Sequence, residues 1–256
     1  MSKLSSAYYE IHHIDNLANK DQWVNQIHPL VKLVITVFYI TTVVSIQKYD
    51  LVRILLFGVY PIAVFILGEI SFLDSIKRLR LILPLVCIVG IFNPFLDRQV
   101  VMQIGNVAVT TGMISMVTLI LKGVYTVFAT YLLIVTTTIE KICYAMRLLH
   151  IPSVLVTQIL LTYRYISVLL KEANTIMQAY LMRAPHQKGV QMKVWGSLVG
   201  QLLFRSVDRA QNVYESMTLR GYQGEFCYVM QERCRAKDYR YLLIWLAIFG
   251  ILKCAI

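Results

Sequence analysis

The chain has 256 residues, of which 57% are hydrophobic and 15% charged, and its mean hydropathy is +0.61. Soluble domains average about 45–50% apolar and about 25% charged residues, so the composition excludes an ordinary soluble protein and indicates an integral membrane protein. The net charge of +11 comes without a basic run interleaved with aromatic residues, which argues against nucleic-acid binding. Lys and Arg instead lie beside or between apolar stretches, as the positive-inside rule predicts for a multi-pass protein.

A helix needs about twenty residues to cross a hydrocarbon core of about 30 Å at about 1.5 Å per residue, and four or five apolar segments come close to that length or exceed it. They cover about 30–46, 51–68, 81–96, 112–137 and 241–256. We therefore expect an all-α integral membrane protein with four transmembrane helices in 30–137 and a fifth in 240–256. Residues 1–29 carry no apolar signal-peptide core and are expected to stay in the cytosol.

Basic residues predict how these helices are oriented. Lys77, Arg78 and Arg80 follow the second segment, and many more Lys and Arg lie in 138–239. We therefore expect both regions in the cytosol and the C-terminus outside. Residues 99–111 alternate apolar and polar side chains around Gly105-Asn106, which predicts a small external β-hairpin.

The fourth segment contains Lys122 among apolar residues. A charge within a membrane span is costly unless it reaches an interface or faces a partner. One interpretation is that Lys122 snorkels to the interface, about ten residues away, or pairs within its own helix. The other interpretation is a contact with another subunit.

The region 138–239 departs from the bilayer pattern and predicts helices over about 138–150, 152–183 and 190–220. In the second helix a polar stripe that includes Arg164 and Lys171 lies opposite an apolar stripe, which is typical of a helix that faces protein rather than lipid. The third helix carries small residues, among them Gly196 and Gly200, that would allow another helix to cross closely. We expect the two long helices to cross each other and to form a cytosolic coupling domain.

Each long helix ends in an arginine, in Met182-Arg183-Ala184 and in Leu219-Arg220-Gly221. One interpretation is electrostatic, because a cation at a helix C-terminus gains about 0.3–1 kcal/mol from the helix dipole. The other is docking, because a charge-assisted bond to a partner carboxylate contributes about 1.5–3 kcal/mol. The recurrence at equivalent ends of two matched helices favours docking, and Gly221 predicts where the second helix stops.

Several short motifs occur in a specific order along nearly the whole chain. They are Asn16-Leu17-Ala18, His28-Pro29-Leu30-Val31-Lys32-Leu33, Thr111-Gly112, Leu149-His150-Ile151-Pro152, Tyr163-Arg164-Tyr165 and the two arginine motifs. With them the chain resembles the transmembrane (T) component of energy-coupling factor (ECF) transporters, most closely the cobalt-type CbiQ branch. Ala184 departs from the family pattern, which has glycine at that position.

The resemblance implies a scaffold in the bacterial inner or plasma membrane that couples ATP hydrolysis to uptake, of cobalt in the closest branch and of nickel or a vitamin as the alternative. It implies two ATP-binding-cassette ATPase subunits, which would dock at Arg183 and Arg220 with their neighbours Met182, Ala184, Leu219 and Gly221. It also implies a membrane substrate-binding subunit of CbiM type, to which a small CbiN-type subunit can be added. Candidate contacts to that subunit or within the scaffold are Lys122, Tyr163, Met177, Tyr180 and Met217.

The residues themselves agree with a non-catalytic subunit that has no cofactor. The chain contains no GxxxxGK[ST] phosphate loop, no GxSxG elbow and no HExxH motif. A metal site could be suspected at the adjacent His12 and His13, but a solvated terminal pair is the simpler interpretation. The competing hypothesis, a substrate-binding membrane subunit, would place ionisable groups facing each other within several spans, whereas Lys122 is almost alone.

Overall fold

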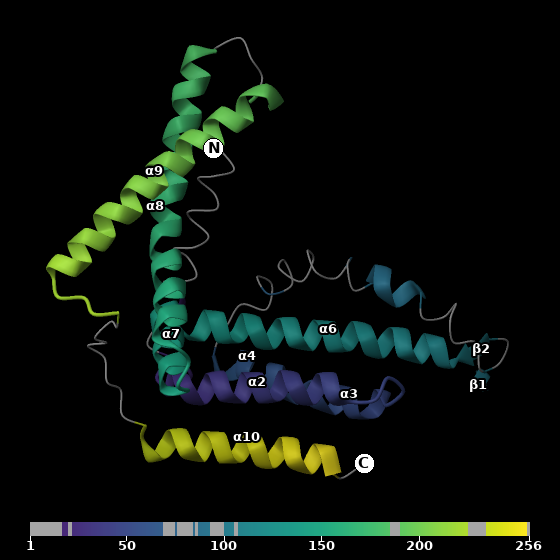
Figure 1. The fold of residues 1–256 in the computed structure, drawn as a ribbon. Coiled ribbons are helices and arrows are strands. Elements are labelled where there is room, and N and C mark those ends of the chain that lie inside the picture. Colours follow the sequence, from purple (N-terminus) through teal and green to yellow (C-terminus); the bar gives the residue numbers. More distant parts are fainter. Residues whose placement is uncertain are drawn as a thin grey trace. The chain divides into compact units, whose positions relative to one another are not determined.

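The computed structural model describes residues 17–19, 22–68, 75, 84, 87–92, 100–104, 107–184, 190–224 and 234–254. In these residues the chain is helical apart from one two-stranded hairpin, and it divides into two units (Figure 1). The core unit contains Leu17–Thr138 and Glu232–Ile256. The inserted unit contains Ile139–Gln231, together with residues 1–16, which lie outside the described part.

The core unit is built from short and long apolar helices. Its elements are α2 (Pro29–Ser45), α3 (Leu51–Phe57), α4 (Val59–Leu67), β1 (Val100–Ile104), β2 (Val107–Thr110), α6 (Thr111–Thr136) and α10 (Ala236–Cys254). The predicted fourth segment is present as α6, and most of the predicted third segment, 81–96, lies outside the described residues. The final helix begins a few residues before the predicted 240–241.

Aromatic side chains fill the centre of the core unit. Phe249 of α10 lies with its ring centroid 5.5 Å from that of Tyr39, 6.0 Å from that of Phe57 and 5.5 Å from that of Tyr60. Trp245, one turn earlier, meets Tyr60 edge-on at 4.8 Å. Such pairs prefer offset or edge-to-face geometry, so the last helix of the chain is fixed against the first ones through specific ring contacts.

The predicted span 51–68 is interrupted at Gly58, between α3 and α4. Pro61 lacks the N–H that would donate to the Phe57 carbonyl four residues earlier, and the Tyr39 hydroxyl donates to that oxygen instead, at 3.0 Å. A Cβ at position 58 would lie 2.6 Å from the Tyr125 hydroxyl oxygen. Glycine at position 58 therefore leaves space for the Tyr125 side chain. The Phe57 carbonyl, which has no helical donor because of Pro61, accepts a hydrogen bond from Tyr39 of α2.

The predicted hairpin is confirmed. Strands β1 and β2 pair antiparallel, with Ile104 opposite Val107, Gln103 opposite Ala108 and Val100 opposite Thr110, and the register shifts between Val100 and Met102. The hairpin leads directly into α6, which begins at Thr111.

Two helices of the described part, α6 and α8 (Ser153–Arg183), are long and apolar enough to cross a membrane, while α2 and the α3–α4 pair are shorter apolar helices. The length of α8 was predicted, but its hydropathy was expected to be that of a cytosolic helix. Residues 153–170 contain a single charged residue, Arg164, whereas Lys171, Glu172 and Arg183 follow in the second half. The helix is therefore apolar along its first half and polar along its second.

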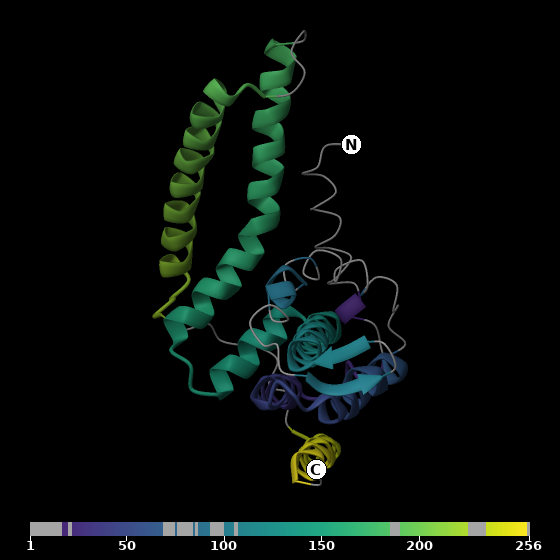
Figure 2. The ribbon, with the colours of Figure 1, turned by 90° about the vertical axis from the view of Figure 1, so that its right-hand side faces the viewer.

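The inserted unit consists of α7 (Ile139–Leu148), α8 and α9 (Met192–Leu219). Helices were predicted here over about 138–150, 152–183 and 190–220. At about 1.5 Å per residue, α8 is about 46 Å long and α9 about 42 Å. Figures 1 and 2 show that α9 crosses α8 diagonally and runs in the opposite direction.

Candidate functional site

Arg183 is the last residue of α8 and is exposed. The helix ends without a left-handed residue, because Ala184 has φ −129° and its N–H donates to the Tyr180 carbonyl at 3.1 Å. The φ of Ala184 is negative, so this position does not need the left-handed conformation that favours glycine. The preceding Met182 side chain is 80% exposed.

Arg220 caps the C-terminus of α9 and is also exposed. Gly221 has φ 83°, the left-handed conformation that glycine adopts without a Cβ clash. The N–H of Gly221 donates to the Thr218 carbonyl at 2.9 Å, and that of Tyr222 donates to the Met217 carbonyl at 3.0 Å. These two bonds form a Schellman motif, so the predicted helix stop at Gly221 is confirmed.

The two arginines lie at opposite ends of the crossed pair, because each ends its own helix and the helices run antiparallel (Figure 1). Within the described part of the chain, neither guanidinium forms an ion pair. Each is preceded by a strongly exposed apolar side chain, Met182 at 80% and Leu219 at 89%. The arrangement offers two separate sites, each with a cation beside an apolar side chain.

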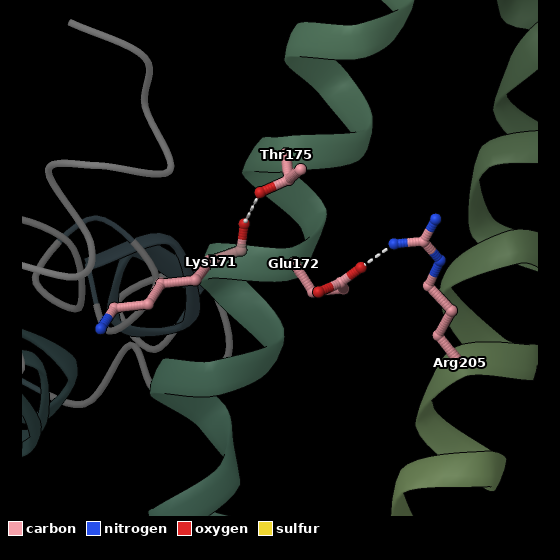
Figure 3. Close-up of polar contacts among 4 residues, drawn as sticks. All are labelled: Lys171, Glu172, Thr175 and Arg205. Carbon is pink, nitrogen blue, oxygen red and sulfur yellow. Dashed lines mark hydrogen bonds and ion pairs between the residues drawn. The ribbon is translucent and has the colours of Figure 1, made fainter.

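An ion pair joins α8 to α9 near the middle of both helices. Arg205 Nη1 donates to Glu172 Oε1 across the gap between the helices (Figure 3). The neighbouring Lys171 carbonyl accepts from the Thr175 hydroxyl at 3.0 Å, a bond within α8. This pair was not predicted, because the two residues are 33 positions apart and no local sequence pattern relates them.

The faces of α9 divide differently from the expectation. Its half-buried residues recur mostly every four positions, at Val194, Leu198, Leu202, Ser206, Val213 and Met217. Large apolar side chains are exposed beside them, at Trp195, Val199, Leu203, Val207 and Tyr214. We call this second set the α9 apolar stripe. Gly196 and Gly200 have no neighbouring atom within 4 Å of an added Cβ, although Gly200 is also half-buried. Contrary to the expectation, these glycines therefore do not form the crossing with α8: at about 100° per residue they lie about 120° and about 160° from the centre of the half-buried face.

The remaining predicted contact residues of the inserted unit are only half-buried. Tyr163, Met177 and Tyr180 lie on α8, and Met217 lies on α9. Their partial exposure leaves surface for a partner.

Lys122 makes hydrogen bonds within the chain. Its ammonium donates to the carbonyl of Val44 at 3.1 Å and to that of Ile46. These carbonyls belong to the C-terminal end of α2, where the last four have no partner within the helix. A lysine of α6 thus caps the end of α2, which places Lys122 within the scaffold.

Lys32 makes the reciprocal contact. This buried side chain of α2 donates from Nζ to the carbonyl of Thr136 at 2.8 Å and to the hydroxyl of Thr137 at 3.3 Å. It also reaches the Asn25 carbonyl at 3.3 Å. Thr136 is the last residue of α6, so each helix of the α2–α6 pair caps the C-terminus of the other with a lysine.

Asp238 is a second buried charged residue that the sequence analysis overlooked. One carboxylate oxygen accepts from the backbone N–H of His28 at 3.1 Å, and the other from that of Arg235 at 2.7 Å. It therefore binds the backbone N–H of the residue that precedes α2 and of the residue that precedes α10, and as the third residue of α10 it caps the start of that helix at Ala236. The signal was present in the sequence as an acidic residue near the start of an apolar helix.

No group of three potential metal ligands occurs in the residues that the structure describes, and the His12-His13 pair lies outside them. Cys143 of α7 is fully buried, and burial, with the Glu140 carboxylate as a smaller cause, raises the pKa of its thiol. A raised pKa keeps this thiol protonated, which disfavours metal binding and nucleophilic chemistry.

Comparison with known proteins covers most of the chain. A family model described as "Cobalt transport protein", CbiQ, matches residues 20–229. An uncharacterised protein of Methanocaldococcus jannaschii is 26% identical over 219 residues, which are 81% of this chain and 75% of that protein. The energy-coupling factor transporter transmembrane protein EcfT of Bacillus subtilis is 27% identical over 222 residues, 78% of this chain and 81% of that protein.

Proposed function

The chain belongs to the CbiQ family of cobalt transport proteins and is a T component of an ECF-type transporter; from this premise we propose that it transmits ATP-driven motion of two cytosolic ATPase subunits to a substrate-binding membrane subunit. It is a membrane protein and a non-catalytic part of the transporter. The observation that carries the proposal is the pair of exposed arginines, Arg183 and Arg220, at opposite ends of two crossed antiparallel helices.

The geometry suits one ATPase subunit at each arginine. A guanidinium can bind a carboxylate through two parallel bonds, which fixes orientation as well as contact. Met182 and Leu219 add exposed apolar surface beside the two cations. Because the sites lie at the two ends of a stiff helix pair, relative movement of two docked subunits would rotate the pair as a lever.

The substrate-binding subunit would meet the inserted unit on its apolar surface. The α9 apolar stripe is exposed, and the bare backbone at Gly196 and Gly200 permits close approach of a partner helix. Tyr163, Met177 and Tyr180 of α8 and Met217 of α9 are half-buried, and we propose them as further contacts to this subunit. The family description favours cobalt as the cargo; nickel or a vitamin is the alternative, and the cargo would be selected by the substrate-binding subunit.

The orientation follows from the basic residues. Residues 139–231 carry 10 Lys and Arg against 5 Asp and Glu, so the positive-inside rule places the inserted unit in the cytosol with the N-terminus. Five spans then leave the C-terminus outside. We place the apolar first half of α8 towards the membrane surface and its charged second half in water.

Charge reversal tests the docking role. Arg183→Glu, Arg220→Glu and the double variant are expressed with the ATPase and substrate-binding subunits, and the complex is purified through a tag on this chain. Each reversal removes a charge-assisted bond worth about 1.5–3 kcal/mol, so each is expected to weaken ATPase binding at least about tenfold. The double variant should lose the ATPases and ATP-driven uptake.

Arg209→Glu provides the matched control, because Arg209 is an exposed arginine in the middle of α9, away from both helix ends. It should retain the ATPases. Normal assembly and uptake in the double variant would refute the docking role, as would equal loss in Arg209→Glu.

A further inference from the structure

The chain leaves the core unit after Thr138 and returns to it at Glu232. Within the core unit, Thr137 and Asp238, close to these two points in the chain, are both hydrogen-bonded to the first turn of α2. The incoming connection follows α6, whose last residue is Thr136 and whose C-cap is Thr137. The outgoing connection precedes α10, which begins at Ala236. The residues that hydrogen-bond to the two ends, His28 and Lys32, are four positions apart, at the N-cap and in the first turn of α2.

Lys32 fixes the incoming connection. Its ammonium donates to the last carbonyl of α6, that of Thr136, at 2.8 Å and to the Thr137 hydroxyl, and the inserted unit begins two residues later at Ile139. The side chain is only 6% exposed. A buried ammonium is retained only where donors and acceptors match well, so this contact resists displacement.

The backbone of His28 fixes the outgoing connection. Asp238 accepts from His28 N–H at 3.1 Å and from Arg235 N–H at 2.7 Å, and its side chain is also buried. His28 itself is held by its imidazole, whose Nδ1 accepts from the Leu30 N–H at 3.3 Å. Pro29, at the first helical position, fixes the backbone between them.

The rest of α2 is immobilised by the core. Ile35, Tyr39 and Val43, spaced four residues apart along one face, have no exposed surface. A displacement of either connection would therefore act on a helix that is packed against the core along one face. If the hydrogen bonds of Lys32 and Asp238 were lost, the two connections could move without moving α2.

We propose that the first turn of α2, from His28 to Lys32, is the fixed anchor through which the inserted unit transmits force to the core unit. Lys32 and Asp238 are positioning residues that hold the two connections to this turn. The proposal rests on the coupling role proposed above and adds the place at which coupling enters the membrane part.

The test measures coupling separately from assembly. Lys32→Met removes the ammonium while keeping the apolar stem, and Asp238→Asn removes the carboxylate charge. Both are studied in the purified complex in vesicles, by ATPase co-purification, ATP hydrolysis and cobalt uptake. We expect co-purification and hydrolysis to persist, and uptake per ATP hydrolysed to fall at least about fivefold, the lower range of coupling between sites. Lys32→Arg, which keeps a cationic donor, should restore part of the ratio.

Lys122→Met is the matched control, because it removes the reciprocal cap at the other end of the same helix pair, away from both connections. It should lower thermal stability and leave uptake per ATP unchanged. Hydrogen exchange adds a readout without transport: amides of residues 137–141 should exchange faster in Lys32→Met, and those of α9 should not.

An unchanged uptake-to-hydrolysis ratio in Lys32→Met, or an equal fall in Lys122→Met, would overturn the proposal and leave Lys32 a stabilising residue alone. Failure of the docking proposal would give a different result, because the ATPase subunits would then still co-purify with the Arg183→Glu and Arg220→Glu variants. The two outcomes are therefore independent.

Discussion

The contact between Glu172 and Arg205 predicts how strongly α8 and α9 hold each other. The α9 helix has no buried residue, so its attachment depends on half-buried apolar contacts and on this ion pair. Replacing Glu172 by Gln, Arg205 by Gln, or both, forms a double-mutant cycle that isolates the pair.

The expected coupling is small, because the two side chains are 34% and 49% exposed. Exposed ion pairs contribute about 0.2–1 kcal/mol. Local opening of α9 should therefore become about 1.4- to 5-fold more frequent when the pair is removed. Arg205→Glu adds repulsion of similar size, which raises the effect to about 2- to 30-fold.

Amide hydrogen exchange along α9 measures this opening directly. The exchanged pair, Glu172→Arg with Arg205→Glu, should return the exchange rates to within about twofold of the original. If the free-energy change in the exchanged pair equals the sum of the changes in the two single reversals, the side chains do not interact and the reasoning is refuted.

Two further predictions concern the core unit and its orientation. Gly58→Ala should lower the thermal unfolding temperature through a clash worth about 1–3 kcal/mol with the Tyr125 hydroxyl, which lies 2.6 Å from the new Cβ; adding Tyr125→Phe should recover part of the loss, and no recovery would contradict the clash. Gln201→Cys, in an otherwise cysteine-free chain, should react with a membrane-impermeant maleimide only after cells are permeabilised, because α9 is placed in the cytosol; labelling of intact cells would reverse the orientation.

Local patterns in the sequence predict local structure well in this chain. The hairpin before α6, the long α6 helix and the glycine stop after Arg220 all depend on neighbouring residues. The two arginines at helix ends were predicted in the same way. Their docking role stays a proposal.

Contacts between distant segments were not predictable in this way. Lys32 and Lys122 look like isolated charges in apolar segments, and their acceptors lie 104 and 76–78 positions away in the chain. Each acceptor is a backbone carbonyl, which every residue possesses, so side-chain patterns carry no sign of it. The break at Gly58 was not predicted for a related reason. Pro61 indicates that the carbonyl four residues earlier lacks its helical donor, but the hydroxyl that donates to this carbonyl belongs to Tyr39 on another helix.

The insertion of 139–231 between α6 and α10 also sets the order in which the protein can be completed during synthesis. Trp245 and Phe249 finish the ring cluster around Tyr60, and Asp238 binds the start of α2. At about 5–20 residues per second, a ribosome needs about 6–24 s to add the 118 residues after Thr138. Throughout that interval α2 lacks its contacts with α10, so the nascent chain must be held by the membrane-insertion machinery. A chain without α10 would lack these contacts of α2 permanently.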